Sequence, residues 1–318
     1  MAITDIAYVV FDHPDLGAAE RFYQDFGLRL AYRSDGEIAF RPALARSYCY
    51  VARQAERPGL AAIAFTASTR ADLEAAARFP EASAITPILR EGGGEKVTLT
   101  SPDGLPFEIV HGIAPYPALA TRAPLTVNNG SAKRRHGEVL RAPLEAAPVL
   151  RLGHIALLTC DFRRNFAWMQ SRLGLQPSDI MYGKDQDDQV GAFMHLQGDG
   201  AWTDHHSLAL FPDPHPRVHH VSFEVEDLDT QAMGNQWLGR QGWTHTWGIG
   251  RHVYGSQIFD YWFDPSGNIA EHFTDGDLVR PGTPPKLVPL DDASLYAWGP
   301  PMEPARFVAM AARHEPRG

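Results

Sequence analysis

The chain has 318 residues, enough for two domains of ordinary size, and its 44% apolar and 21% charged residues exclude a disordered chain or a coiled coil. A formal net charge of −9 disfavours nucleic acid and anionic membranes as partners. No apolar run approaches the ~18 residues that span a bilayer, and the first residues carry no basic region or cleavage site. With only two cysteines, we expect a protein of the reducing cytoplasm.

The first half of the chain shows a strand-and-helix pattern that occurs twice. A strand is expected at residues 6–11, followed by a helical pattern at residues 15–28. A second strand at residues 60–66 precedes a second helical pattern at residues 69–78. The half ends at residues 101–109, where a turn with proline and glycine leads into a strand.

The second half repeats this order. A strand is expected at residues 152–159 and a helix at residues 161–174. A further strand at residues 219–226 and a helix at residues 228–240 follow. The half closes on a similar turn and strand at residues 264–271.

The helix at residues 161–174 has the clearest local signals. Apolar side chains at 4-3-4 spacing define one buried face, formed by Phe162, Phe166, Met169 and Leu173. Asp161 suits the N-cap position, and Gly174 suits the helix stop. We therefore expect one amphipathic helix here.

The repeat predicts an α+β protein of two tandem domains, each made of two βαβββ modules that curl into an open barrel. The two domains are expected at residues 1–113 and 151–277. Residues 114–150, rich in proline, alanine and basic side chains, suit a linker. Residues 278–318 form a proline-rich tail, and the aromatic residues at its centre predict that it packs back onto the body.

The predicted strand at residues 219–226 has one polar face. His220, Ser222 and Glu224 lie on that face, whereas Val221, Phe223 and Val225 lie on the other. A polar inward face is typical of a sheet that lines a cavity. The same alternation places His219 with the apolar side chains, so His220 is the better functional candidate. Taken alone, a histidine in an apolar strand is more often a hydrogen-bonded core residue than a ligand.

Four stretches of the second half stand at characteristic intervals. They are Gly153-His154-Ile155-Ala156-Leu157, His205-His206-Ser207-Leu208, Arg217-Val218-His219-His220-Val221, and a segment from Gly250 to Glu271 that contains His252 and Tyr261. Fourteen residues separate His206 from His220, and ten separate Tyr261 from Glu271. In these stretches the chain resembles the type I extradiol ring-cleavage dioxygenases of the vicinal-oxygen-chelate superfamily, such as the catechol, homoprotocatechuate and dihydroxybiphenyl dioxygenases. One departure is Asp260, where the family usually has an apolar residue before the tyrosine.

The resemblance implies that His154, His220 and Glu271 are metal ligands. Two neutral imidazoles and one carboxylate on one side of a ferrous ion leave the opposite positions open. A catechol can chelate there through both oxygens while dioxygen takes a neighbouring site. The same donors suit manganese, so Fe²⁺ is expected with Mn²⁺ as the alternative.

The resemblance also implies three catalytic residues. His206 would accept and return a proton, since an imidazole with a pKa of ~6.5 can do both near neutral pH. Tyr261 and His252 would hydrogen-bond the substrate oxygens and stabilise the charge that grows during the reaction. Of the pair His205-His206, the resemblance gives the proton-transfer role to His206 and leaves His205 as a bystander.

The first half lacks most of these residues. Aligned on the repeat, Tyr8 takes the position of His154 and Ala62 that of His220, while Glu108 matches Glu271. We therefore expect a first domain that binds no metal and supports the fold.

The function expected from these observations is extradiol cleavage of a catechol-type diol with O₂ in aromatic catabolism, by a homo-oligomer (dimer or tetramer). Two alternatives remain open. One is a metal-dependent non-redox enzyme of the same superfamily, such as an isomerase or a glyoxalase-like protein. The other is a ligand-sequestering protein of the bleomycin-resistance kind, which would need no metal.

Overall fold

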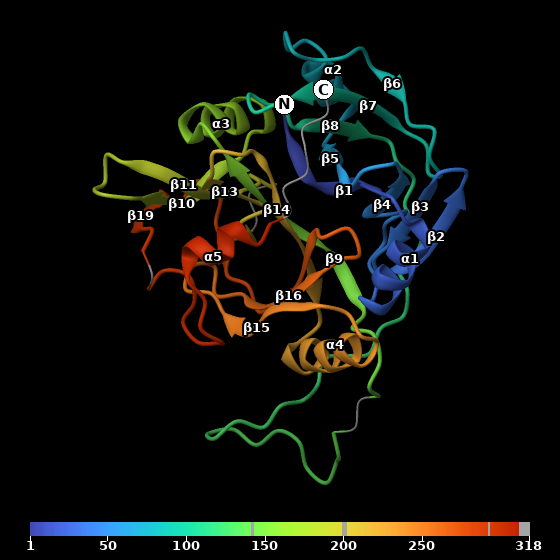
Figure 1. Ribbon diagram of the computed structural model, residues 1–318, viewed down its shortest axis with the longest axis vertical. Helices are drawn as coiled ribbons and strands as arrows, with labels where there is room; N and C mark the ends of the chain where they lie inside the picture. Colours follow the sequence, from blue (N-terminus) through green and yellow to red (C-terminus); the bar gives the residue numbers. More distant parts are fainter. Residues whose placement is uncertain (141–142, 199–201, 292, 312–318) are drawn as a thin grey trace.

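Two open β-sheets, one from each half of the chain, form the framework of the protein (Figure 1). The computed structural model describes residues 1–140, 143–198, 202–291 and 293–311. The elements of the first half are β1 (Ile3–His13), α1 (Leu16–Asp25), β2 (Arg29–Ser34), β3 (Glu37–Arg41), β4 (Tyr50–Gln54), β5 (Gly59–Ala67), α2 (Arg70–Ala76), β6 (Thr86–Pro87), β7 (Glu95–Thr100) and β8 (Pro106–His111).

The second half repeats the order and adds three elements at its end. Its elements are β9 (Val149–Thr159), α3 (Phe162–Trp168), the π-helical turn η1 (Met169–Leu173), β10 (Gln176–Tyr182), β11 (Gln189–His195), β12 (Thr203–Asp204), β13 (Leu208–Pro212), β14 (Arg217–Val225), α4 (Leu228–Arg240), β15 (His245–Arg251), β16 (Ile258–Phe263), β17 (Ile269–Thr274), β18 (Leu278–Val279), β19 (Lys286–Pro289) and α5 (Pro304–Ala309).

The strand orders confirm the predicted α+β modules. The first sheet runs β2-β3-β4-β1-β5-β8-β7-β6, and the second runs β15-β16-β17-β14-β9-β13-β11-β10-β19. In each sheet the first strands of the two modules, β1 with β5 and β9 with β14, pair antiparallel at the centre. Within the described residues, no helix is both long and apolar enough to cross a membrane.

The helix predicted at residues 161–174 begins and ends where its sequence signals place it. The Asp161 carboxylate accepts a hydrogen bond from the amide of Arg164, and Gly174 ends the segment with φ of 67°. The structure adds one feature, because the last turn, Met169–Leu173, is π-helical. Met169 and Leu173 are buried as the spacing predicts.

The two halves share one apolar core and contact each other through equivalent turns. The turn before β17 contacts the first half, where the Tyr23 hydroxyl donates to the Asp264 carboxylate (3.0 Å). The turn before β8 contacts the second half, where the Thr159 hydroxyl donates to Asp103 (2.7 Å). A single cluster of buried side chains extends through both halves. The sheets are therefore held together by a pseudo-symmetric interface.

The segment between the sheets contains no helix or strand among its described residues, and Figure 1 shows it as the green loop below α4. Arg122 anchors it to α4, because its guanidinium donates to the Asp227 carboxylate at 2.6 and 3.0 Å. Asp227 is also the N-cap of α4 and accepts from the amide of Thr230. The domain boundaries at residues 113, 150 and 277 stay a prediction.

Replacing Asp227 by alanine is expected to lower the free energy of unfolding by about 1–2 kcal/mol at neutral pH, because the cap is lost. Burial raises the pKa of Asp227, but the Arg122 guanidinium and the Thr230 amide lower it to about 2. The carboxylate therefore stabilises the fold above its unfolded pKa of about 3.9, and this stabilisation disappears as the pH falls toward 2. Urea unfolding at several pH values measures the difference. Asp229→Ala, in the exposed first turn of the same helix, is the control; equal losses in both variants would contradict the assignment.

The C-terminal tail packs against the second sheet in its described residues. Strand β19 adds to the sheet edge beside β10, and β18 pairs with β12. Tyr296 contacts Trp247 edge-to-face with ring centroids 5.7 Å apart, whereas Trp298 is 45% exposed. Residues 292 and 312–318 of the predicted tail lie outside the described residues.

Candidate metal centre

Three neighbouring strands bring His154, His220 and Glu271 to one face of the second sheet. On β9 and β14, His154 pairs with Ser222, and Ser222 pairs in turn with Glu271 on β17. His220 precedes Ser222 by two residues, so its side chain lies on the same face. At Gly153 a Cβ atom would lie 2.3 Å from the Phe273 ring, so any other residue would force that ring to shift.

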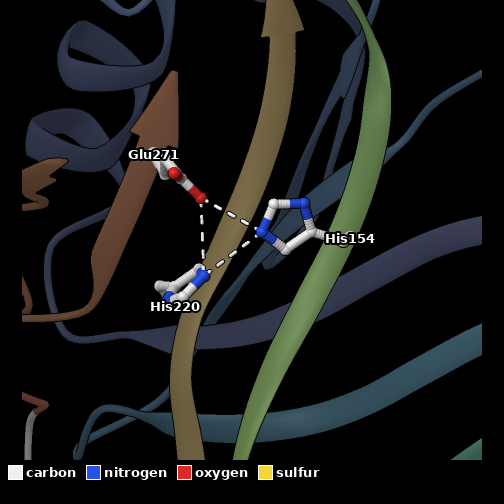
Figure 2. Close-up of side chains that lie close together, drawn as sticks. All are labelled: His154, His220 and Glu271. Atoms are coloured by element: carbon white, nitrogen blue, oxygen red, sulfur yellow. Dashed lines mark hydrogen bonds and ion pairs between the residues drawn. The ribbon is translucent and has the colours of Figure 1, made fainter. Parts of the chain in front are cut away.

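The three side chains point toward one another, as Figure 2 shows. The Nε2 atoms of His154 and His220 are 3.3 Å apart, and they lie 3.2 and 3.4 Å from Oε2 of Glu271. All three residues are buried, with 4% exposure or less. Among the described residues, this is the group of histidine, cysteine or carboxylate side chains whose geometry could hold a metal ion.

The donor set fits a divalent cation. Metal–ligand bonds of about 2.0–2.2 Å place neighbouring ligand atoms roughly 3 Å apart, close to the spacing found here. Neither oxygen of Glu271 makes a hydrogen bond of ordinary geometry to a described residue. An ionised carboxylate that is buried without such partners is costly unless a cation compensates it. The centre therefore has the ligands of a two-histidine, one-carboxylate metal site and a buried negative charge that a cation would compensate.

His219 orients the ligand ring of His220. The register between β9 and β14 skips His219, which forms a bulge. The His219 ring therefore lies beside His220 and packs on Phe307, instead of pointing with the apolar face as the alternation predicted. Since the Phe307 carbonyl can only accept, Nε2 of His219 donates to it (2.8 Å) and Nδ1 accepts from Nδ1 of His220 (2.7 Å). This leaves Nε2 of His220 free of a proton and facing the centre.

His252 and Tyr261 lie next to Glu271 and contact each other. Tyr261 on β16 pairs directly with Glu271 on β17. His252 follows β15, and its Nδ1 donates to the carbonyl of Leu295 in the tail (2.7 Å). In the neutral ring, Nε2 then accepts from the Tyr261 hydroxyl (2.8 Å). The structure thus brings both predicted residues beside the three candidate ligands.

His206 also lies at the centre, in the short turn between β12 and β13. Its ring centroid is 4.3 Å from that of His154, and the residue is buried. Its Nδ1 lies 3.1 Å from Nδ1 of His205, whose Nε2 lies 2.9 Å from the Asp179 carboxylate. From the sequence, His205 was predicted to have no role, and no pattern pointed to Asp179. The repeated His-His pair was the available signal, since both pairs use the first histidine to hold the second.

Burial controls protonation at this centre. It lowers the pKa of His206 well below the ordinary value, and the nearby His154 lowers it further. Burial and the charge of Glu271 raise the pKa of Tyr261 well above 10. Burial also raises the pKa of Glu271, but His154 and His252 outweigh it, so that pKa is below its usual range. Near neutral pH the imidazole of His206 and the phenol of Tyr261 are therefore neutral, and Glu271 is a carboxylate.

A cavity opens over the candidate ligands. It encloses about 590 Å³, counting its mouth, which is the size of an ordinary small-molecule site. His154, His206, His220, His252 and Tyr261 form its polar end. The other lining side chains are mostly apolar, and several come from the tail.

Asp260, the departure from the family pattern, lies away from the cavity. Its carboxylate is fully buried and accepts from the side chains of Asn235 (3.0 Å), Trp262 (2.7 Å) and His245 (2.8 Å). A buried carboxylate with these partners satisfies its hydrogen-bonding needs. Asp260 therefore supports β16 behind Tyr261 without touching the reacting face.

The equivalent position in the first half is closed by protein groups. Tyr8 pairs with Ala64, and Ala64 pairs with Glu108, which reproduces the register of the centre. The Tyr8 hydroxyl donates to Glu108 (2.6 Å), and Lys96 forms an ion pair with the same carboxylate. The predicted equivalence of Tyr8 and Glu108 thus has a structural counterpart. That this half binds no metal stays a prediction.

A family of known proteins matches the second half of the sequence, and one relative matches nearly the whole chain. Residues 151–271 match the Glyoxalase/Bleomycin resistance protein/Dioxygenase superfamily. Metapyrocatechase 2 of Cupriavidus necator is 31% identical over 314 residues, which cover 96% of this chain and 92% of that protein.

Two solved structures share the fold. Homoprotocatechuate 2,3-dioxygenase from Arthrobacter globiformis superposes with a TM-score of 0.81 at 22% identity, covering 99% of this chain and 95% of the other. A Mn(II)-bound glyoxalase from Novosphingobium aromaticivorans has a TM-score of 0.78 at 23% identity, covering 96% and 94%.

The chain belongs to the glyoxalase/bleomycin resistance/dioxygenase superfamily and, within it, to the type I extradiol dioxygenases. The predicted vicinal-oxygen-chelate fold and the predicted enzyme class are confirmed. As a member of this class, the enzyme depends on a metal.

Proposed function

We propose that the enzyme opens the ring of a catechol beside its two hydroxyl-bearing carbons and incorporates both atoms of O₂ into the product. The principal support is the geometry of His154, His220 and Glu271, whose ligand atoms lie 3.2–3.4 Å apart at the end of a cavity. The relative and the neighbour named as metapyrocatechase and homoprotocatechuate 2,3-dioxygenase support the same reaction. Because both oxygen atoms enter the product, no external reductant is needed.

We assign the ligand role to His154, His220 and Glu271 and propose that they hold Fe²⁺. When bound, the ion supplies a Lewis acid for the two catechol oxygens and a neighbouring position for dioxygen. One carboxylate offsets only part of the ion's charge, so the centre favours a catechol that has lost a proton. The same ligand set accepts Mn²⁺, and metal reconstitution separates the two.

The remaining polar residues manage protons and charge around the substrate. His206 accepts a proton from a catechol hydroxyl and returns it later in the reaction. His252 and Tyr261 hydrogen-bond the substrate oxygens as negative charge develops on them. The apolar walls exclude water from this end of the cavity.

Anaerobic reconstitution tests the reaction and the metal together. Metal-stripped enzyme is loaded with Fe²⁺ or Mn²⁺ without oxygen, and catechols are then added in air. We expect the Fe²⁺ enzyme to form a visible-absorbing ring-fission product, to consume one O₂ per catechol and to exceed the Mn²⁺ enzyme in rate. Absence of product with monocyclic, bicyclic and carboxylated catechols would contradict the function. A faster Mn²⁺ enzyme would contradict only the choice of metal.

We also propose that the enzyme works in the cytoplasm as a homo-oligomer, a dimer or a tetramer, in the breakdown of aromatic compounds. The resemblance to the family and the two free cysteines support this proposal. Light scattering on the purified protein is expected to give a mass that is a multiple of 35.1 kDa. A monomer at micromolar concentration would contradict the assembly.

A further inference from the structure

We propose that the preferred substrate is an uncharged catechol with an apolar substituent, an inference that rests on the proposed function. Beyond the polar end, the cavity is lined mostly by apolar side chains: Met181, Phe193 and Phe211 from the sheet and Leu290, Leu295 and Phe307 from the tail. The other polar residues of the lining, Tyr254, Gln257 and Ser294, have no cationic group. The apolar side chains can contact an apolar substituent of the catechol, and they provide no charged group that could pair with an ionic one. A carboxylate placed against them would lose its hydration without compensation.

The tail decides this preference as much as the sheet does. Leu290, directly after β19, is held by the hydrogen bond from its amide to the Tyr182 carbonyl (2.9 Å). Leu295 contacts the centre through its carbonyl, which accepts from His252. Phe307 of α5 packs on Tyr261 with ring centroids 5.5 Å apart. Part of the cavity wall is therefore built from tail residues, of which Leu295 and Phe307 contact the polar end directly.

Two probes of matched shape test the preference. 4-Isobutylcatechol and 3,4-dihydroxyphenylacetate have substituents of the same branching that differ in charge. We expect kcat/KM for the isobutyl compound to exceed that for the acid by at least about tenfold. An equal or reversed preference would overturn the inference, while cleavage of unsubstituted catechol would still uphold the reaction. If no catechol is cleaved, the dissociation constants of the two probes are measured without oxygen. Tighter binding of the isobutyl compound is then the result expected, and equal or weaker binding would overturn the inference.

A pair of tail variants locates the effect. Leu290→Ala removes a lining side chain and is expected to lower the ratio of kcat/KM for 4-isobutylcatechol over catechol about 3- to 10-fold. Leu287→Ala, within β19 and 43% exposed, is expected to leave the ratio unchanged. Equal effects of the two variants, or none from either, would contradict a substrate wall at Leu290.

A second inference follows independently from the hydrogen bonds behind His206. We infer that Asp179 and His205 are positioning residues that fix the proton of His206 on Nδ1. A carboxylate only accepts hydrogen bonds, so Nε2 of His205 donates to Asp179 (2.9 Å). In a neutral His205, Nδ1 must then accept, and Nδ1 of His206 donates to it (3.1 Å). Nε2 of His206 keeps its lone pair and can accept the substrate proton.

The pair His219-His220 has the same hydrogen-bonding pattern, which supports this assignment. There, His219 donates to the Phe307 carbonyl and accepts from Nδ1 of the following histidine. His205 is buried between its two partners in the same way, with 6% exposure. His206 and His220 are thus each held by the histidine before them.

Three variants test whether Asp179 and His205 position His206. The amide of Asp179→Asn can donate to His205, which reverses the direction of both hydrogen bonds. We therefore expect kcat to fall about 10- to 100-fold while KM stays within roughly twofold of the wild-type value. His205→Leu breaks the chain and is expected to lose as much. His205→Gln can donate to Asp179 and accept from His206, so it is expected to recover at least about a third of the wild-type kcat. Loss in the glutamine variant equal to that in the leucine variant would overturn the inference.

A spectroscopic readout separates positioning from a general structural effect. In the zinc-loaded full-length enzyme with ¹⁵N-labelled histidine, the ring of His206 is expected to carry its proton on Nδ1. In Asp179→Asn, that proton is expected on Nε2. The same tautomer in both proteins would contradict the inference whether or not the enzyme turns over catechol.

Discussion

Replacing Glu271 by glutamine is expected to release the metal and to lower ring cleavage by at least about 100-fold. Glu271 is the single carboxylate of the centre, and glutamine keeps its shape while removing the charge that balances the ion. The readouts are metal content after dialysis against buffer without iron, and the initial rate of product formation.

The first half supplies the matched control for this variant. Glu108 has the same place in its sheet register, but Tyr8 and Lys96 occupy its oxygens. Glu108→Gln is therefore expected to keep the metal and the rate per folded molecule, although it loses an ion pair. Full metal content in Glu271→Gln, or metal loss in both variants, would contradict the assignment of the ligands.

Replacing His206 by phenylalanine is expected to keep the metal and to lower kcat about 10²- to 10⁴-fold, the range for removal of a group that moves protons in the transition state. Phenylalanine fills the space beside the rings of His154 and Phe193 without a nitrogen. Metal content and anaerobic substrate affinity should stay close to those of the wild type. The measurement is steady-state turnover of iron-loaded protein.

His215→Phe is the control, because His215 is exposed in the turn before β14. It is expected to turn over like the wild type. If His206→Phe also turned over normally, the proton-transfer role would be wrong. If it lost its metal, His206 would have to be reassigned as a residue that supports the ligands.

Local sequence signals were enough to predict the modules. The Asp161 cap, the Gly174 stop and the apolar spacing between them depend on neighbours a few residues apart. The repeat of these signals predicted the second copy of each unit. Periodicity also placed His220 and Ser222 on one face, and their register with His154 and Glu271 follows from the paired strands.

Features that depend on distant contacts could not be predicted from local patterns. The bulge that turns His219 toward His220 arises from the pairing of β14 with β9, and α5 then supplies the carbonyl that holds it. Asp179 contacts His205 across 26 residues of sequence. The tail's position against His252 depends on its packing, which a proline-rich composition does not specify.

The position of the iron in a crystal of the Fe²⁺-loaded enzyme, located by anomalous scattering at the iron edge, tests directly whether His154, His220 and Glu271 hold the metal. We expect one strong peak within bonding distance of Nε2 of His154, Nε2 of His220 and a carboxylate oxygen of Glu271. A fully loaded, active enzyme whose anomalous peak lay elsewhere, or was bonded to only one of these side chains, would contradict this assignment.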